Sequence, residues 1–233
     1  MLLVWLVVLP IAALLIVPSA QLLMRADDPM PVPEETWDLD GAQVAPEQVP
    51  ADWTQEEWVV DPVGDETRAQ VDQILAGGRL RPDTVYVPAL KIVLPFHDVG
   101  QTNGWLDLEY GVVDTGVRFE EVGSFEAGSQ VISAHVNNRK LQLSPFARLA
   151  DAKRGMVVAV TDANAQPYYY KTTALNYYDK GRLPAEMWDD EGSPTVHLVT
   201  CGGRIARSPY DGLRHYTDNV VLRAEAFDPW AAS

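Results

Sequence analysis

The chain has 233 residues, a formal net charge of −15 and a single cysteine. This length allows one domain of ordinary size, with about 60 to 90 further residues at one end. One cysteine excludes an internal disulfide framework and any multi-cysteine zinc site.

Residues 1–24, MLLVWLVVLPIAALLIVPSAQLLM, carry no ionisable side chain. An uncharged apolar run of about 20 residues is long enough to span a bilayer as a helix. A cleaved export signal usually begins with basic residues and has small residues before the cut, whereas this start is uncharged and VPSA places Pro18 there. We therefore favour an uncleaved single-pass anchor in the cell membrane, with the acidic bulk of the chain on the extracellular side.

Residues 26–72 hold fourteen Asp or Glu and one basic residue, Arg68, so this stretch accounts for −13 of the net charge. It also contains six prolines and few β-branched residues. We predict an extended, self-repelling acidic stalk over 25–72. The rest of the chain sums to −2, which gives the folded part no electrostatic reason to bind nucleic acid or anionic lipid headgroups.

The segment 64–78, GDETRAQVDQILAGG, predicts a short helix that leads into the folded domain. Val71, Ile74 and Leu75 recur at helical spacing, acidic residues stand at the start and two glycines at the end.

Short runs rich in Val, Ile and Tyr follow, separated by turn-forming residues. They span 83–96, 129–136, 155–162, 166–178, 194–201 and 218–227. Pro88 and Pro95 mark the first run as an edge or interrupted strand. One helical segment, 143–153, opens with Ser144 as N-cap and Pro145 in the first turn. Many short strands with brief connections predict an all-β sandwich or barrel.

Cys201, in TVHLVTCGG at 195–203, is the only thiol. A lone cysteine is most often a small buried hydrophobe, and the other possibilities are an intermolecular bridge or a reactive nucleophile. A catalytic cysteine attacks as the thiolate, so it needs a neighbour that lowers its pKa or takes its proton.

Four histidines are available as that neighbour. His197 precedes Cys201 by four residues, but TVHLVTC is a strand pattern, and at about 3.3 Å per residue the two would stand about 13 Å apart. This distance excludes His197 both as proton partner and as metal co-ligand. His135 ends the run SQVISAH, where a barrel rim could present it, whereas His97 and His215 lie in predicted loops and are weaker candidates.

Attack on an amide also creates an oxyanion that needs stabilisation. Arg204, Arg207 and Arg214 all follow Cys201 in a predicted loop. Arginine stays charged and presents several donors at once. Any one of the three could be a solvated loop charge, but the group together favours a role in catalysis.

The ordered set ISAHVNN (132–138), LVTCGG (198–203) and LRHYTDNVVLRA (213–224) resembles the sortases, cysteine transpeptidases of the cell wall of Gram-positive bacteria. VYVPALKI at 85–92 is similar to the first barrel strand of that family, and KGRLPAEMW at 180–188 to the loop before the cysteine strand. LPAE together with TCGG and YTDNVVL is most similar to the class F group of actinobacteria, with class E as neighbour. The resemblance covers about 84–227.

The resemblance implies a closed sortase-type β-barrel of about eight strands with short helices over 73–233. It also implies that Cys201 is the nucleophile, His135 the general acid and base, and Arg214 the arginine that stabilises the oxyanion. Arg204 and Arg207 stay open as alternatives, because RIARSPYDGL lengthens the loop after the cysteine. Ala134 replaces a glycine usual in the family, a change tolerated where the backbone is not in a glycine-only conformation.

The resemblance further implies that Thr200 helps to orient the substrate carbonyl. The loop 178–194 would form a wall of the substrate groove, with apolar side chains that bind the substrate; these are Leu183, Pro184, Met187 and Trp188. We interpret the acidic DDE at 189–191 as solvated surface and expect neither a metal nor a cofactor.

The implied activity is cleavage of an LPXTG-type sorting signal through an acyl-enzyme thioester, followed by transfer to an amine of a peptidoglycan precursor or a pilin. We expect a monomer attached to the membrane by its N-terminal helix, with no nucleic acid partner. The exact sorting motif, the acceptor amine, and the choice between anchoring and pilus assembly stay open.

Two other kinds of cysteine enzyme lack their signatures here, since the chain has neither the SHGC of an L,D-transpeptidase nor the CGS of a papain-like peptidase. The alternative from another class is a membrane-anchored β-barrel binding module with an inert, buried Cys201.

Overall fold

The computed structural model describes residues 64–102, 105–106, 108–109, 111–138, 140–180, 182–207 and 214–231, together with the strand Glu56–Glu57. The predicted anchor at 1–24 and the rest of the acidic stretch before residue 64 lie outside the described residues. Within the described part of the chain, no helix is long and apolar enough to cross a membrane.

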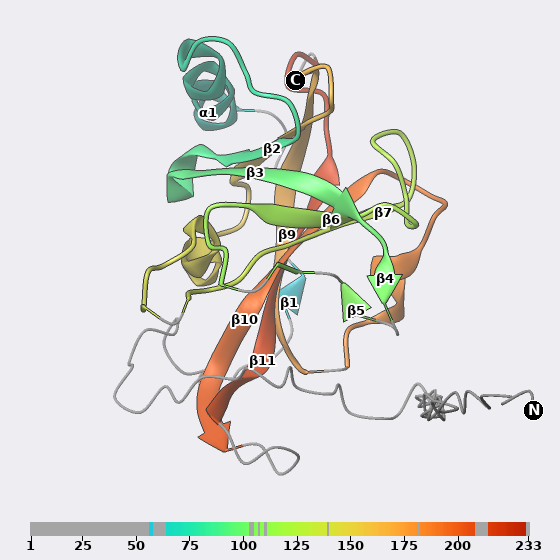
Figure 1. Ribbon diagram of the computed structural model, residues 1–233. Coiled ribbons are helices and arrows are strands. Elements are labelled where there is room, and N and C mark those ends of the chain that lie inside the picture. The colour runs from blue at the N-terminus through green and yellow to red at the C-terminus, as the bar shows by residue number, and fades with distance from the viewer. Residues whose placement is uncertain are drawn as a thin grey trace, which may run out of the picture.

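Eight strands close on themselves into a barrel (Figure 1). Each strand is hydrogen-bonded to the next in the order β9, β11, β10, β7, β6, β3, β2, β8, and β8 pairs again with β9. The pairs β7–β10 and β3–β6 are parallel and the other pairs antiparallel. The strands are β2 (Thr84–Val87), β3 (Ile92–Val99), β6 (Gly116–Phe119), β7 (Ser129–Ser133), β8 (Val157–Thr161), β9 (Pro167–Asp179), β10 (Thr195–Arg207) and β11 (Arg214–Ala226). The expected closed all-β barrel of eight strands is confirmed.

Three two-residue strands lie outside the closed barrel. β1 (Glu56–Glu57) adds to the edge of β9 opposite Leu175 and Ala174, where β8 no longer covers that edge. β4 (Gln101–Thr102) and β5 (Trp105–Leu106) form a separate hairpin.

The helix α1 (Asp65–Ala76) agrees with the predicted helix at 64–78 and spans residue 72, where the sequence divided stalk from barrel. Its buried Val71 and Ile74 pack against Val157 and Tyr169, so the helix covers one side of the barrel. The described residues also form three 3-10 helices, η1 (Pro88–Leu90), η2 (Pro145–Asp151) and η3 (Ala185–Trp188).

The prolines and caps act as the sequence predicts. The first apolar run is interrupted at Pro88, where η1 separates β2 from β3. Ser144 caps η2, and its hydroxyl accepts a hydrogen bond of 3.1 Å from the N–H of Phe146. The 143–153 segment is therefore helical, but as a 3-10 helix of seven residues.

The prediction of a long loop after Cys201 is wrong. β10 continues to Arg207 and β11 begins at Arg214, so Arg204 and Arg207 lie on a strand, and so does His215. His97, also predicted in a loop, lies exposed on β3. These segments look polar because a hairpin that extends past the barrel has little apolar surface to cover, and polarity hides its strand periodicity.

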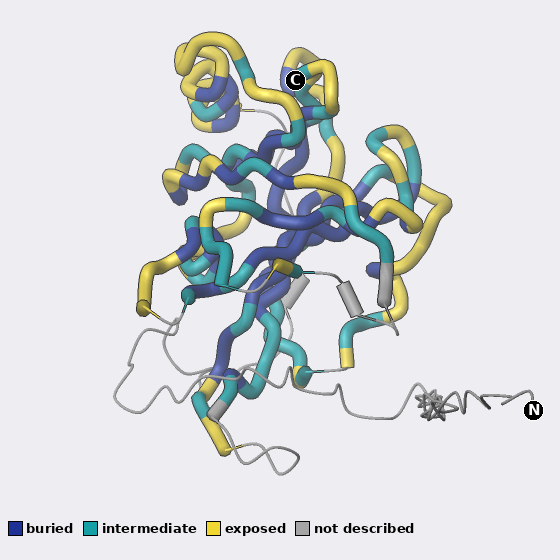
Figure 2. Tube along the Cα trace, in the orientation of Figure 1, coloured by how far each residue is buried: buried dark blue, intermediate teal, exposed yellow. Residues whose placement is uncertain are grey.

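Residues 195–200 of β10 and 220–222 of β11 are buried on both faces, which explains the apolar residues that stand next to one another there. Val196, Leu198 and Leu222 point into the barrel core, whereas Val199 and Val221 join a second cluster on the outer face; that cluster also holds Phe119, Val122, Val131 and Met187. In Figure 2 the buried segments run through the middle of the molecule and the exposed ones lie in the peripheral loops.

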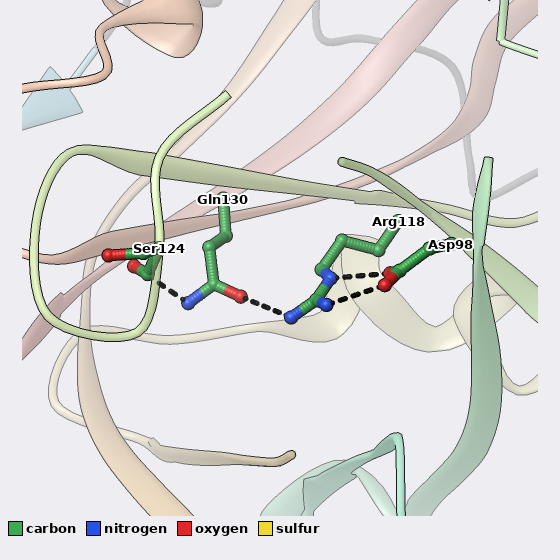
Figure 3. A network of polar contacts seen from close by, with 4 residues as sticks. All are labelled: Asp98, Arg118, Ser124 and Gln130. Atoms are coloured by element: carbon green, nitrogen blue, oxygen red, sulfur yellow. Dashed lines mark hydrogen bonds and ion pairs between the residues drawn. The ribbon is translucent and has the colours of Figure 1, made fainter. Parts of the chain in front are cut away.

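Arg118 of β6 connects its strand to β3 and β7 by side-chain hydrogen bonds (Figure 3). Its guanidinium makes two hydrogen bonds to the Asp98 carboxylate of β3, at 2.7 and 2.8 Å, and a third to Gln130 of β7 at 3.3 Å. Gln130 in turn donates to the backbone carbonyl of Ser124 and to the Tyr170 hydroxyl. This bidentate ion pair fixes the lateral position of the short strand β6.

We expect Leu198→Ala to lower the free energy of unfolding by about 2 to 5 kcal/mol, because it leaves a cavity in the barrel core. Leu143→Ala serves as control: this leucine is 53% exposed, and its loss should cost less than about 0.5 kcal/mol. Urea unfolding measures both. Equal effects of the two changes would contradict the core assignment.

Candidate active site

The parallel pairing of β7 with β10 places His135 beside Cys201. Ser133 lies opposite Val199 in the last residue pair of the two strands. One step further, the N–H of Ala134 donates to the carbonyl of Val199 at 3.1 Å, and the hydroxyl of Thr200 donates to the carbonyl of Ala134 at 2.8 Å. The next residues are His135 and Cys201, on segments that continue strands about 4.8 Å apart.

Both side chains lie on the outer face of the barrel. Alternation along a strand puts Cys201 on the same side as Val199, which belongs to the outer cluster. On its other side, Cys201 lies opposite Asn219 of β11, and Asn219 lies opposite Tyr178 of β9. A row of four side chains therefore crosses this face from β7 to β9. We call His135, Cys201, Asn219 and Tyr178 the Cys201 row.

His135 is held as a neutral base. Burial lowers its pKa most strongly, a backbone hydrogen bond with Glu109 raises it, and the charge of Lys180 lowers it again. Nε2 is buried and has no hydrogen-bond partner among the described residues.

Cys201 is a free thiol of intermediate exposure. It packs against a small cluster that includes Val136, Ile205 and Tyr216. Burial, followed by the nearby Cys201, raises the pKa of Tyr216 to about 12, so this phenol stays neutral beside the sulfur. The thiol is therefore covered by this cluster on one side and accessible to solvent on the other, so that a substrate can approach it.

Thr200 is almost fully buried. Its hydroxyl is engaged by the carbonyl of Ala134, the residue directly before His135. Thr200 therefore positions the backbone that carries His135, and a contact with substrate stays a prediction. The site also tolerates Ala134, whose φ is not in the left-handed region.

The segment 178–194, which is predicted to form a wall of the substrate groove, comes directly after most of β9 in the chain. Met187 is completely buried in the outer cluster, with Leu183 partly buried against it, so Met187 is a core residue. Trp188 is 36% exposed and meets the ring of Phe119 edge-on at 5.8 Å. Pro184 lines a cavity of about 40 Å³ over the outer face, whose other lining residues are Ala174, Asn176, Tyr178, Glu186, His197, Val221 and Arg223.

His197 lies on the same strand as Cys201 and is only 2% exposed. Burial, and secondly the charge of Arg223, lowers its pKa to about 4. It lies opposite Val131 of β7 and Arg223 of β11. This places it on the outer face, two residues before Val199 along β10. The strand spacing that excluded His197 as proton partner is confirmed.

The three arginines proposed for the oxyanion lie beyond the Cys201 row. Arg207 and Arg214 oppose each other at the far end of the β10–β11 pairing. Because Asn219 marks the level of Cys201, the Arg214 backbone stands five residues further on, about 16 Å along an extended strand. Arg204 is exposed and lies in the irregularity between Gly202 and Ile205.

Gly203 makes that irregularity possible. Its φ is +78°, and a Cβ there would overlap the Asp218 carboxylate. Only glycine combines a left-handed backbone with so close an approach. This explains the second glycine of TCGG, and it is the reason that the register of β10 shifts soon after the cysteine.

Sequence reasoning did not find Asn219, Tyr178, Tyr216 or Lys180. All four come from strands or strand ends whose register the sequence leaves open. The YTDN motif at 216–219 contributes to the class F resemblance, but the sequence does not indicate that Asn219 lies opposite Cys201.

The chain matches the family model described as the sortase domain over residues 85–227. Among solved structures it is similar to sortase A of Listeria monocytogenes, with 15% identity, 65% of this chain and 89% of the other covered, and a TM-score of 0.46. It is also similar to sortase A of Corynebacterium diphtheriae (17% identity, 68% of each chain, TM-score 0.45) and to sortase C of Streptococcus pneumoniae (16%, 76% and 81%, TM-score 0.47). No curated protein matches the chain.

Thr200→Val should lower the free energy of unfolding by about 1 to 3 kcal/mol, since it leaves the buried carbonyl of Ala134 without its donor. Thr200→Ser keeps the hydroxyl and should lose less. Thermal and urea unfolding compare the two, and equal losses would mean that the methyl group rather than the hydroxyl carries the effect.

The buried His197 should make stability fall with acid. A folded pKa of about 4 lies below the unfolded value of about 6.5, so the stabilisation is complete above pH 6.5 and is lost as pH falls toward 4. The shift corresponds to about 3 kcal/mol. Urea unfolding at pH 7 and pH 4 should show a smaller pH dependence for His197→Gln than for the wild type; an unchanged pH dependence would refute the buried neutral state.

Proposed function

The chain belongs to the sortase family and is a cysteine transpeptidase, and we propose that it cleaves an LPXTG-type sorting signal between threonine and glycine. The family rests on the sortase-domain match over 85–227. The observation that carries the proposal is the adjacent placement of His135 and Cys201 at the ends of two paired strands on an open face.

In the first half-reaction His135 takes the proton of the Cys201 thiol on Nε2. The thiolate sulfur then adds to the threonine carbonyl carbon, and the carbonyl oxygen becomes an oxyanion. When the tetrahedral intermediate collapses, the C–N bond breaks and the imidazolium gives its proton to the departing glycine amine. The product is a thioester between Cys201 and the threonine of the sorting signal.

In the second half-reaction an amine attacks the thioester. His135 takes a proton from the attacking nitrogen and returns it to the sulfur as the C–S bond breaks, which restores the thiol. Because the second step is the first in reverse with another amine, the same residue serves both. The lowered pKa of His135 supports its role, since the neutral form is the base that each addition needs.

For the substrate groove we propose the outer face bordered by the segment 180–194. Leu183, Pro184 and Trp188 are partly or fully accessible there and offer apolar surface to the sorting signal. The segment is fixed to β7, because the Ser129 hydroxyl donates to the carbonyl of Glu186 at 2.8 Å and its N–H to that of Asp189 at 2.7 Å. The role of Arg214 at the oxyanion stays a prediction from the resemblance.

We further propose a class F or class E type of actinobacterial enzyme, anchored in the cell membrane by residues 1–24 with the barrel outside. The acceptor amine would belong to a peptidoglycan precursor or a pilin. A tether near the membrane raises the effective concentration of enzyme toward a surface protein and a lipid-linked acceptor.

The test uses the full-length chain in detergent with a quenched LPXTG peptide and hydroxylamine as amine. We expect cleavage at the Thr–Gly bond and a threonine hydroxamate detected by mass spectrometry. Cys201→Ala should abolish the product, and His135→Ala should lower the rate by about 10² to 10⁴-fold. His97→Gln, an exposed histidine on β3, is the matched control and should leave the rate unchanged.

Cleavage that survives Cys201→Ala would overturn the mechanism. Absence of cleavage with LPXTG and with other sorting peptides, together with a Cys201 that resists alkylating reagents in the folded protein, would favour the binding module.

A further inference from the structure

A hairpin turn follows His135 in the chain. Leu143 lies opposite Asn137 in an antiparallel bridge. Asn137 is two residues past His135, and Cα atoms paired in this way are about 5 Å apart, so the Cα of Leu143 lies within about 12 Å of that of His135. The turn therefore borders the β7 end of the Cys201 row. We call residues 137, 138 and 140–143 the Leu141 turn.

Hydrogen bonds of Asn138 hold the Leu141 turn in one conformation. The N–H of Asn138 donates to the carbonyl of Gln142 at 3.1 Å, and its carbonyl accepts from the N–H of Leu141 at 2.9 Å. Its side-chain Oδ1 accepts from the N–H groups of Lys140 and Gln142 at 3.0 and 3.1 Å, and its Nδ2 donates to the Gln142 side chain at 2.8 Å. The turn therefore presents its other side chains on a fixed backbone.

Leu141 has a backbone conformation that does not suit leucine. Its φ is +60°, and it occupies the last of the three positions between Asn138 and Gln142. Hairpin loops of this length commonly place glycine in that conformation, because glycine has no Cβ to clash. Burial does not offset the strain, since 42% of Leu141 is exposed. A strained and exposed apolar residue beside an active site points to a function of its side chain.

Leu143 and Lys140 complete the surface of the Leu141 turn. Leu143 is even more exposed than Leu141, so the turn offers two apolar side chains to solvent. Lys140 is exposed, and within the described residues it takes part in no ion pair. The charge of Lys140 favours a carboxylate on a bound molecule over a further ammonium group.

The Leu141 turn and the segment 180–194 lie on opposite sides of the Cys201 row. Segment 180–194, the proposed border for the sorting signal, is bound to Ser129, six residues before His135 on β7, whereas the turn follows His135. A sorting signal that lies against 180–194 has its scissile carbonyl at Cys201 and its amide nitrogen at the His135 imidazole, which protonates that nitrogen. The group attached to the nitrogen then extends toward the Leu141 turn.

We propose that Leu141 and Leu143 bind the acceptor of the transpeptidation, a peptide amine that carries an apolar side chain and a carboxylate within the next two residues. This rests on the proposed function and names the chemistry of its second substrate. A peptide advances about 3.3 Å per residue, so such a side chain reaches the turn while the nitrogen stays at His135. Because the second half-reaction reverses the first, the departing peptide passes over the same surface.

The experiment follows transfer by the full-length protein in detergent from a sorting peptide that ends in glycine amide. This substrate has nothing beyond the glycine to contact the turn, so variants of the turn act on the second half-reaction alone. The acceptors are the peptides Gly-Leu-Glu, Gly-Ser-Glu and Gly-Leu-Lys, with hydroxylamine as an amine too small to reach the turn. Mass spectrometry quantifies each product.

Leu141→Gly and Leu143→Ala should each raise the apparent KM for Gly-Leu-Glu by about 5- to 20-fold, as expected for losing part of the burial of one leucine. Transfer to Gly-Ser-Glu and to hydroxylamine should change by less than about twofold, since neither brings an apolar side chain. In the wild type, Gly-Leu-Lys should have a KM up to about fivefold above that of Gly-Leu-Glu. Leu75→Ala, a leucine of similar exposure (43%) on α1, is the matched control and should change no KM.

A second readout does not depend on transfer. Leu141→Gly should leave Tm unchanged or raise it, because glycine adopts a φ of +60° without the clash of a Cβ. Weaker transfer by a protein that is as stable as the wild type is the combined result expected. A lowered Tm with unchanged transfer would mean that the leucine serves the fold, and it would overturn the role of Leu141 at the acceptor.

The other outcomes separate this proposal from the proposed function. Unchanged transfer to Gly-Leu-Glu in both turn variants, with hydroxamate still formed, would overturn the acceptor surface and leave the transpeptidase function intact. A wild-type dimer that dissociates in Leu143→Ala, measured by sedimentation, would mean that the turn contacts a second copy and would also overturn it. If the wild type forms no hydroxamate from any sorting peptide, the proposed function fails and the acceptor surface fails with it.

Discussion

Parallel hydrogen bonding between β7 and β10 brings together Ala134 and Thr200, which lie 66 positions apart, and with them the two residues that follow. Parallel strands cannot be joined by a short hairpin and need a long crossover. Here the crossover contains β8 and β9, the strands that close the barrel on the far side of β11. Closing the barrel and assembling His135 with Cys201 are therefore one event, and a change that loosens the β7–β10 pairing affects both stability and chemistry.

The solvent exposure of the outer face of β10 increases within a few residues. His197 and Val199 are covered by the segment that contains η3, and they are buried as deeply as core residues. Cys201, two residues further along the same face, is only half-buried. Covering the outer cluster stabilises the barrel, and the end of that cover gives substrate access to the thiol. The same segment thus serves as a packing layer and, in the proposed function, as a border of the substrate groove.

Directly after the cysteine, the strand pair departs from regular geometry. Gly203 adopts a left-handed backbone against the Asp218 carboxylate, and the register shifts before Ile205. The hairpin then extends past the barrel, so the backbone positions of Arg207 and Arg214 lie beyond the Cys201 row.

The sequence by itself determined the local structure: the helix at 64–78, the break at Pro88, the cap at Ser144 and most of the strands follow from spacing and turn chemistry within a few residues. It also determined that His197 cannot reach Cys201, because that distance depends on strand rise alone. Only the tertiary structure decided that His135 is the neighbour, that Asn219 and Tyr178 complete the row, and that β10 and β11 continue as strands to Arg207 and from Arg214. The physical reason is that register belongs to pairs of strands: a slip of one residue would send every side chain to the opposite face, and only packing of both faces of β10 selects the register that is observed.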